Sequence, residues 1–344
     1  MGAARADTIE LANGGKRDGQ VTSAKWDSVQ YVVGKAPTTL SGDQVLSIAR
    51  DSTFLQAGRE ALEGGDYSKA VSSLSAVGDK AKDWEQAEAR YLTGRALHAA
   101  GNHKEAEKVL KAYLDRYKGD KDWFVPHATL LMGDVLLAAR QPGTAEIHYK
   151  ELDQYGPKWV LQGKLGQGKA LLGKGESGAT EARRLFDDVA RSAAAAAGVR
   201  QQAIVWKARA YLLQKQPQQA IKELTTEFFD APKPGEIGYT AERAEATVLM
   251  GEAHAMLGGK ANLEEAEIWF LRTVALFRKN PAVYARACSG LAGAYTELGN
   301  KPRADDWKQK GSAAGGSASA APVPAPAPAA PAKAPAAKAA KGKS

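Results

Sequence analysis

Residues 91–113 read YLTGRALHAAGNHKEAEKVLKAY and carry a helical pattern on each side of a short turn. Before the turn, Tyr91, Gly94 and Leu97 follow one another at spacings of three; after it, Ala106 and Leu110 are four apart. Spacings of three and four place residues on one face of an α-helix. The turn is marked by Gly101 and the asparagine after it. The stretch therefore predicts two amphipathic helices that pack against each other.

The same pattern recurs along most of the chain. A first small residue stands at Gly58, Gly94, Gly133, Gly168, Ala208, Gly251 and Ala292. A second small residue follows at Ala70, Ala106, Ala145, Ala182, Ala220, Ala266 and Ala304. A large residue usually lies four positions later, but the last copy has Lys308 there, as expected for a capping helix. The recurrence predicts seven helical pairs over residues 51–310.

Glycine in the middle of these helices is the informative choice. It costs about 1 kcal/mol against alanine in a helix interior, and domains have only about 5–15 kcal/mol of net stability. We expect the missing side chains to let the second helix of each pair approach very closely.

The pattern resembles the tetratricopeptide repeat (TPR) family, most clearly in residues 91–113 and in FLQAGREALEGGDYSKAVSSL, residues 54–74. The resemblance covers about 260 residues. It implies a mainly α fold, a superhelix whose concave groove binds peptides. Successive first small residues are 35 to 43 positions apart, which is longer than the family repeat, so a less specific α-solenoid is the structural alternative.

In the family, the position after the first small residue lines the groove. Here that position holds Arg59, Arg95, Asp134, Lys169, Arg209, Glu252 and Gly293. The resemblance implies a basic stripe of Arg59, Arg95, Lys169 and Arg209 above an apolar floor that includes Tyr91. Such a stripe would bind an acidic segment or a terminal carboxylate. The alternative is that these charges are solvated or pair with neighbouring acidic residues.

Residues 7–50 have a different pattern. Short runs rich in Val, Thr, Tyr and Trp are separated by turn signals at Asn13-Gly14-Gly15, near Trp26 and at Ser41-Gly42-Asp43. They predict four or five short strands in a small, bent β-barrel, which resembles the Sm-like or SH3-like barrels.

The two ends differ from the rest of the chain. Residues 311–344 are almost entirely Ala, Pro, Lys, Gly and Ser, a composition that predicts a disordered tail. The tail is interpreted as a linker or a tether near the cell envelope, with nonspecific polyanion binding as the alternative. At residues 1–6, Ala4-Arg5-Ala6 resembles the end of a secretory signal. This favours export to a bacterial periplasm or cell envelope, and the alternative is a cytoplasmic protein.

Gly163–Ala170 comes within one residue of a phosphate-binding loop, but Ala170 stands where that loop needs a metal-binding hydroxyl. Gly168 is in phase with the repeat glycines, so we interpret the segment as part of a helix. Five scattered histidines and the single Cys288 form no metal-ligand or nucleophile pattern. No catalytic, cofactor-binding or metal residue is predicted, and no small-molecule substrate.

We therefore expect a noncatalytic scaffold that binds a protein or peptide partner, which could be acidic. The alternative is a nucleic-acid-associated adaptor that uses the small barrel and the basic tail. The net charge of +8 does not demand such a partner, because four lysines of the tail supply about half of it. Near the strands, only Lys25, Trp26 and Tyr31 combine charge with aromatic rings, which argues against nucleic acid.

Overall fold

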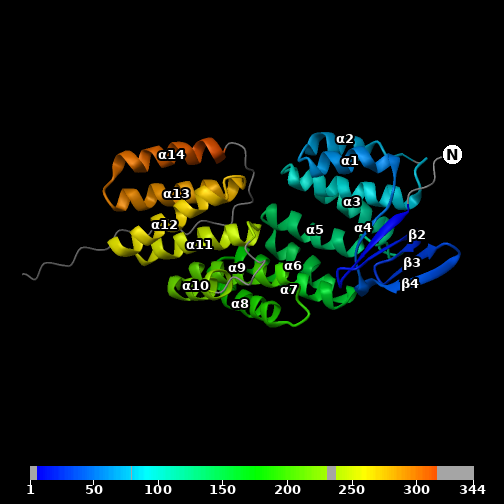
Figure 1. Ribbon diagram of the computed structural model, residues 1–344, viewed down its shortest axis with the longest axis horizontal. Helices are drawn as coiled ribbons and strands as arrows, with labels where there is room; N and C mark the ends of the chain where they lie inside the picture. The colour runs from blue at the N-terminus through cyan, green and yellow to red at the C-terminus, as the bar shows by residue number, and fades with distance from the viewer. Residues whose placement is uncertain (1–5, 79, 231–237, 316–344) are drawn as a thin grey trace, which may run out of the picture.

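A computed structural model describes residues 6–78, 80–230 and 238–315 of the 344-residue chain. Figure 1 shows a small sheet beside one end of a long array of helices. Most of the predicted leader, residues 1–5, and most of the predicted tail, residues 316–344, lie outside the described residues.

The N-terminal module is a five-stranded antiparallel sheet in the order β4-β3-β2-β1-β5. Its strands are β1 Asp7–Leu11, β2 Lys16–Ala24, β3 Ser28–Val33, β4 Ala36–Ser41 and β5 Val45–Ala49. A short 3-10 helix, η1 Gly42–Gln44, joins the last two strands. The predicted short strands are therefore confirmed as an antiparallel sheet, but closure of this sheet into the predicted small barrel is not. Among the described residues β4 and β5 do not pair with each other, so the sheet is open at both edges.

The sheet is bound to the helices through a shared core. Ile9, Val29 and Val45 are fully buried on its inner face, and Trp123 from the helical region belongs to the same cluster. Trp26 donates its backbone N–H to the carbonyl of Lys121 at 3.0 Å. Because its apolar face is covered in this way, the sheet needs no second sheet of its own.

Within the residues that the structure describes, the helical region consists of seven pairs, as predicted. The first helices are α1 Thr53–Glu63, α3 Asp83–Ala99, α5 Val125–Ala138, α7 Pro157–Gly173, α9 Ala197–Leu213, α11 Ala241–Leu257 and α13 Pro281–Glu297. The second helices are α2 Tyr67–Ser75, α4 His103–Tyr117, α6 Pro142–Glu151, α8 Glu176–Arg191, α10 Pro217–Leu224, α12 Lys260–Leu276 and α14 Lys301–Gly315. A 3-10 turn, η2 Leu152–Tyr155, extends α6, and a π-helical turn, η3 Thr225–Phe229, extends α10. The last helix continues five residues past the predicted boundary at 310.

The mid-helix glycines have the packing role that the sequence predicted. A Cβ added to Gly94 would lie 2.6 Å from Leu110, and one added to Gly251 would lie 2.6 Å from Phe270. Gly58, Gly133 and Gly168 face Leu74, Tyr149 and Phe186 equally closely. In each of these pairs the second helix therefore rests its large side chain directly on the backbone of the first.

Two of these side chains also touch the next pair. A Cβ at Gly166 of α7 would clash with the ring of Tyr149, and one at Gly290 of α13 would clash with the ring of Phe270. Each ring is thus held between the backbones of two successive first helices.

The turns between paired helices use the left-handed backbone region. Gly65, Gly101, Gly175 and Gly299 have φ between 76° and 89° just before the second helix. Arg140 and Lys215 take the same conformation, with φ of 62° and 56°. The backbone is strained at these two residues, because in this conformation the Cβ lies too close to the following carbonyl oxygen.

Each first helix packs against the next one along the chain, from α1·α3 through to α11·α13. Among the described residues, successive second helices make far fewer contacts with each other. In a curved stack the inner layer is the more closely spaced one, so the first helices form the inner layer and the second helices the outer layer. Figure 1 shows the pairs following an arc from α1 through α7 to α14.

Candidate functional site

The inner layer of first helices carries the predicted groove residues, and the structure gives each of them a different environment. Arg59 of α1 is committed to internal contacts. Its Nη2 lies 2.6 Å from Oε1 of Glu88 on α3, and its Nη1 donates to the carbonyl of Arg50 at 2.7 Å. Burial raises the pKa of the Glu88 carboxyl, although Arg59 acts against this shift. Arg59 therefore joins two helices.

Arg209 of α9 is part of a charged network across three first helices. It pairs with Glu245 of α11, and Arg286 of α13 reaches the same carboxylate at 2.6 Å and Glu252 at 2.8 Å. Burial opposes ionisation of Glu245, but Arg209 and Arg286 outweigh it and lower its pKa. The positive charge of Arg209 is thus neutralised within the protein.

Tyr91 of α3 is packed inside, with 8% of its surface exposed. Its ring stacks on Phe124 at 4.8 Å and lies 6.1 Å from the ring of His127. Arg95, one helical turn later, is exposed and lies over the Tyr91 ring at 5.9 Å. No ion-pair partner for Arg95 occurs within residues 6–78, 80–230 and 238–315, so its charge faces outward.

Lys169 of α7 is half-buried, and its Nζ lies 5.6 Å from the ring centre of Trp206 on α9. Arg209 lies over the same ring at 4.6 Å. In the part of the chain that the structure describes, no carboxylate pairs with Lys169. Lys169 and Arg95 are therefore the two predicted groove cations whose charges are not neutralised by an ion pair.

The structure does not bring all five predicted residues together. Arg95 on α3 and Lys169 on α7 are separated by α5. Two successive helix-to-helix spacings amount to about 20 Å. Sequence reasoning missed Glu245 and Arg286, which form the charged network with Arg209. A signal was present: each lies seven residues before a predicted groove position, Glu252 and Gly293, and therefore on the same helix face.

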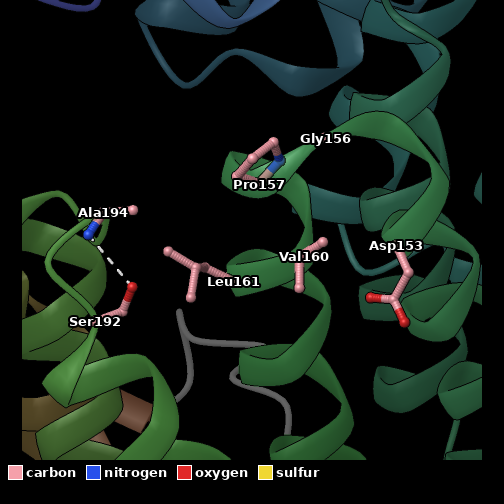
Figure 2. A pocket seen from close by; sticks show the side chains of 7 residues that line it. All are labelled: Asp153, Gly156, Pro157, Val160, Leu161, Ser192 and Ala194. Atoms are coloured by element: carbon pink, nitrogen blue, oxygen red, sulfur yellow. Dashed lines mark hydrogen bonds between the residues drawn. The ribbon is translucent and has the colours of Figure 1, made fainter.

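A separate hollow of about 390 Å³ opens beside the start of α7. It is lined by Asp153, Gly156, Pro157, Val160, Leu161, Ser192 and Ala194. Figure 2 shows Leu161 between Val160 and the turn of Ser192 and Ala194, with Asp153 farther off. The backbone N–H of Ala194 donates a hydrogen bond to Oγ of Ser192 at 3.3 Å. The hollow is mostly apolar and gathers no set of polar groups suited to catalysis.

The other sequence candidates are parts of the packing. Gly168 lies in the middle of α7, so the segment resembling a phosphate loop is helical throughout. Cys288 is fully buried. Within the described ranges, no group of three or more His, Cys, Asp or Glu side chains is arranged to hold a metal ion. No helix in those ranges is long and apolar enough to cross a membrane.

The rings that would serve a nucleic-acid site on the β module are also used in packing. The rings of Trp26 and Tyr155 pack edge to face with their centres 5.1 Å apart, and Nζ of Lys121 lies 5.5 Å from the centre of the Trp26 ring. Tyr31 has 4% of its surface exposed. Tyr31 is therefore not available to stack on a base, and the partly buried ring of Trp26 is already in contact with Tyr155 and Lys121.

Comparison with known proteins agrees with the repeat architecture. Residues 55–121 match the tetratricopeptide repeat family. No curated protein matches the chain.

Among solved structures, NprR in complex with its cognate peptide NprX is similar over 74% of this chain and 75% of that one, at 13% identity and a TM-score of 0.51. The apo form of RapI is similar over 76% of this chain and 96% of that one, at 10% identity and a TM-score of 0.51. A thermophilic TPR protein of Thermus thermophilus covers 60% of this chain and 98% of its own, at 16% identity and a TM-score of 0.46. The fold is therefore a TPR-type α-solenoid with an N-terminal β-sheet. The repeats at residues 55–121 are tetratricopeptide repeats.

Proposed function

We propose that this protein is a noncatalytic scaffold that binds an acidic protein or peptide segment on its inner layer of helices. The observation that carries the proposal is the pair of cations, Arg95 and Lys169, without ion-pair partners among the described residues. Each lies over an aromatic ring: the buried ring of Tyr91 supports Arg95, and the partly buried ring of Trp206 offers an apolar contact next to Lys169. Charge next to aromatic surface is a common composition for binding peptides.

The two cations set the form of the bound segment. Their separation of about 20 Å matches about six residues of an extended chain, which rises about 3.3 Å per residue. One carboxylate cannot reach both cations. The proposal is therefore an extended segment with two acidic groups five or six residues apart, or one acidic side chain and a terminal carboxylate.

Arg59 and Arg209 have a supporting role in this proposal. Because they pair with Glu88 and Glu245, they hold neighbouring helices together and do not attract the segment. Stacked repeats of this kind create the extended concave surfaces that solenoid proteins use for binding. The similar NprR structure contains a cognate peptide, which supports a peptide ligand for this chain.

The test selects peptides from a random display library on the full chain and measures their affinity by fluorescence anisotropy. We expect acidic peptides whose affinity falls as salt rises. The Arg95→Gln, Lys169→Gln double variant should bind at least tenfold more weakly. The matched control, Lys111→Gln with Lys222→Gln, removes two exposed cations from the outer helices α4 and α10 and should bind like wild type. Equal affinity of both double variants would refute the proposed site.

A further inference from the structure

The outer helix α12 exposes an apolar stripe that no described part of the chain covers. Ile268 is 44% exposed, Leu271 37% and Leu276 50%. Ile268 and Leu271 are three residues apart and Ala275 follows four later, so these three share one face of the helix. Single exposed apolar residues are common on protein surfaces, but a stripe along one helix is a candidate contact surface.

The charges along α12 are divided between its two halves. Glu264 and Glu265 are exposed before the stripe, while Arg272 and Arg278 are exposed beside it and just beyond the helix end. Glu264 has a distant contact with Lys260 at 3.8 Å. Glu265, Arg272 and Arg278 have no ion-pair partner among the residues that the structure describes. The helix dipole favours this order of charges, but it does not account for an apolar stripe between them.

We propose that α12 is the contact surface for a second copy of this chain, with the two α12 helices packed antiparallel. A two-fold axis between Ile268 and Leu271 places each of them against the other on the second copy. Glu265 then lies beside Arg272 of the second copy, with an offset along the axis of about 3 Å at 1.5 Å per residue. A parallel arrangement would instead place Glu265 against Glu265. Complementary charge and self-complementary shape are what a two-fold interface requires.

The contact is small and leaves the inner layers open. One helix from each copy buries less than the roughly 1,600 Å² of a standard stable interface, so the dimer forms at micromolar or higher concentration. Both inner layers remain accessible because α12 belongs to the outer layer. The dimer would thus bind two segments, or two sites on one partner, with greater avidity than the single chain.

Sedimentation equilibrium of the full chain, from micromolar to several hundred micromolar, tests the apolar contact. We expect the average mass to rise from 36.4 kDa towards twice that value. The Ile268→Glu, Leu271→Glu double variant should stay monomeric. The control Ile147→Glu changes an exposed apolar residue on α6, another outer helix, and should associate like wild type. A wild-type chain that stays monomeric at the highest concentration would overturn the proposal.

Charge exchange tests the antiparallel arrangement. The Glu264→Arg, Glu265→Arg variant and the Arg272→Glu, Arg278→Glu variant should each dimerise at least tenfold more weakly than wild type. Their equimolar mixture should recover the wild-type constant, because each altered half then faces an opposite charge. If either separate variant dimerises as strongly as wild type, or if the mixture associates no better than the separate variants, the antiparallel register is wrong. Circular dichroism of each variant excludes unfolding as the cause.

Discussion

Replacing Gly168 by alanine tests whether helix contact or helix propensity decides the stability of this solenoid. The new Cβ would lie 2.6 Å from Cζ and 3.0 Å from Cδ1 of Phe186, where ordinary contacts begin at 3.4 Å. Phe186 is fully buried, so its ring or the helix must move by roughly 1 Å in a close-packed interior. Such overpacking costs about 1–3 kcal/mol, while alanine gains about 1 kcal/mol in helix propensity.

Gly293→Ala is the matched control. Gly293 is also inside a first helix, but nothing lies within 4 Å of its added Cβ. This variant should gain only the higher helix propensity of alanine and be about 1 kcal/mol more stable than wild type. Because both variants share that term, the difference between them, about 1–3 kcal/mol, measures the clash.

The assay is unfolding in urea, monitored by circular dichroism, and the readout is the urea concentration at the midpoint of the transition. Solenoids lose cooperativity in long arrays, so the two variants should be compared by midpoints and slopes together. We expect Gly168→Ala to unfold at lower urea than Gly293→Ala. Equal stabilisation by both substitutions would refute close packing as the reason for the repeat glycines.

Three further predictions concern the turns, the charged network and a buried histidine. Arg140→Gly and Lys215→Gly should each stabilise the protein by about 1 kcal/mol in the same urea assay, because glycine relieves the left-handed backbone; a loss of stability would contradict the strain. Glu245→Ala should cost about 3 kcal/mol because it leaves two arginines without their shared carboxylate, whereas Lys310→Gln, which breaks an exposed pair on α14, should change the stability by less than about 1 kcal/mol. Burial lowers the pKa of His127 to about 3, below its unfolded value of about 6.5. The neutral imidazole therefore contributes stability above pH 6.5 that is lost as the pH falls towards 3, and wild type should lose about 1–2 kcal/mol more than His127→Gln between pH 7 and pH 5.

The sequence predicts the repeats well because their determinants are local. One repeat is enough to reveal its own two helices. The spacing from Gly94 to Ala106 and the large side chain of Leu110 indicate the helix period and the pairing of the two helices. The turn before β3 is likewise marked by residues adjacent in the chain. These features depend on neighbours within about 20 positions, so one sequence is enough to find them.

The charged contacts of the inner layer are much less predictable. Arg59 pairs with Glu88 and Arg209 with Glu245, across 29 and 36 positions. Whether such side chains meet depends on the rotation of one helix relative to the next, which the repeat pattern does not specify. The docking of the β module through Trp123 is missed for the same reason. The tail, its envelope association and the export of the protein stay predictions, because most of the relevant residues are outside the described ranges.

The packing of the Tyr149 and Phe270 rings predicts that stability is not uniform along the solenoid. Each ring locks one pair to the next by resting on glycine in both first helices, so the third and fourth pairs, and the sixth and seventh, should open together. The fifth pair has Ala208 at the close-packing position, and neither Tyr149 nor Phe270 spans its boundary with the fourth or the sixth pair. Amide hydrogen exchange should then show two protected blocks joined by a region that opens at lower free energy. A chain that bends between two stiff blocks can adjust the curvature of its inner layer to partners of different length.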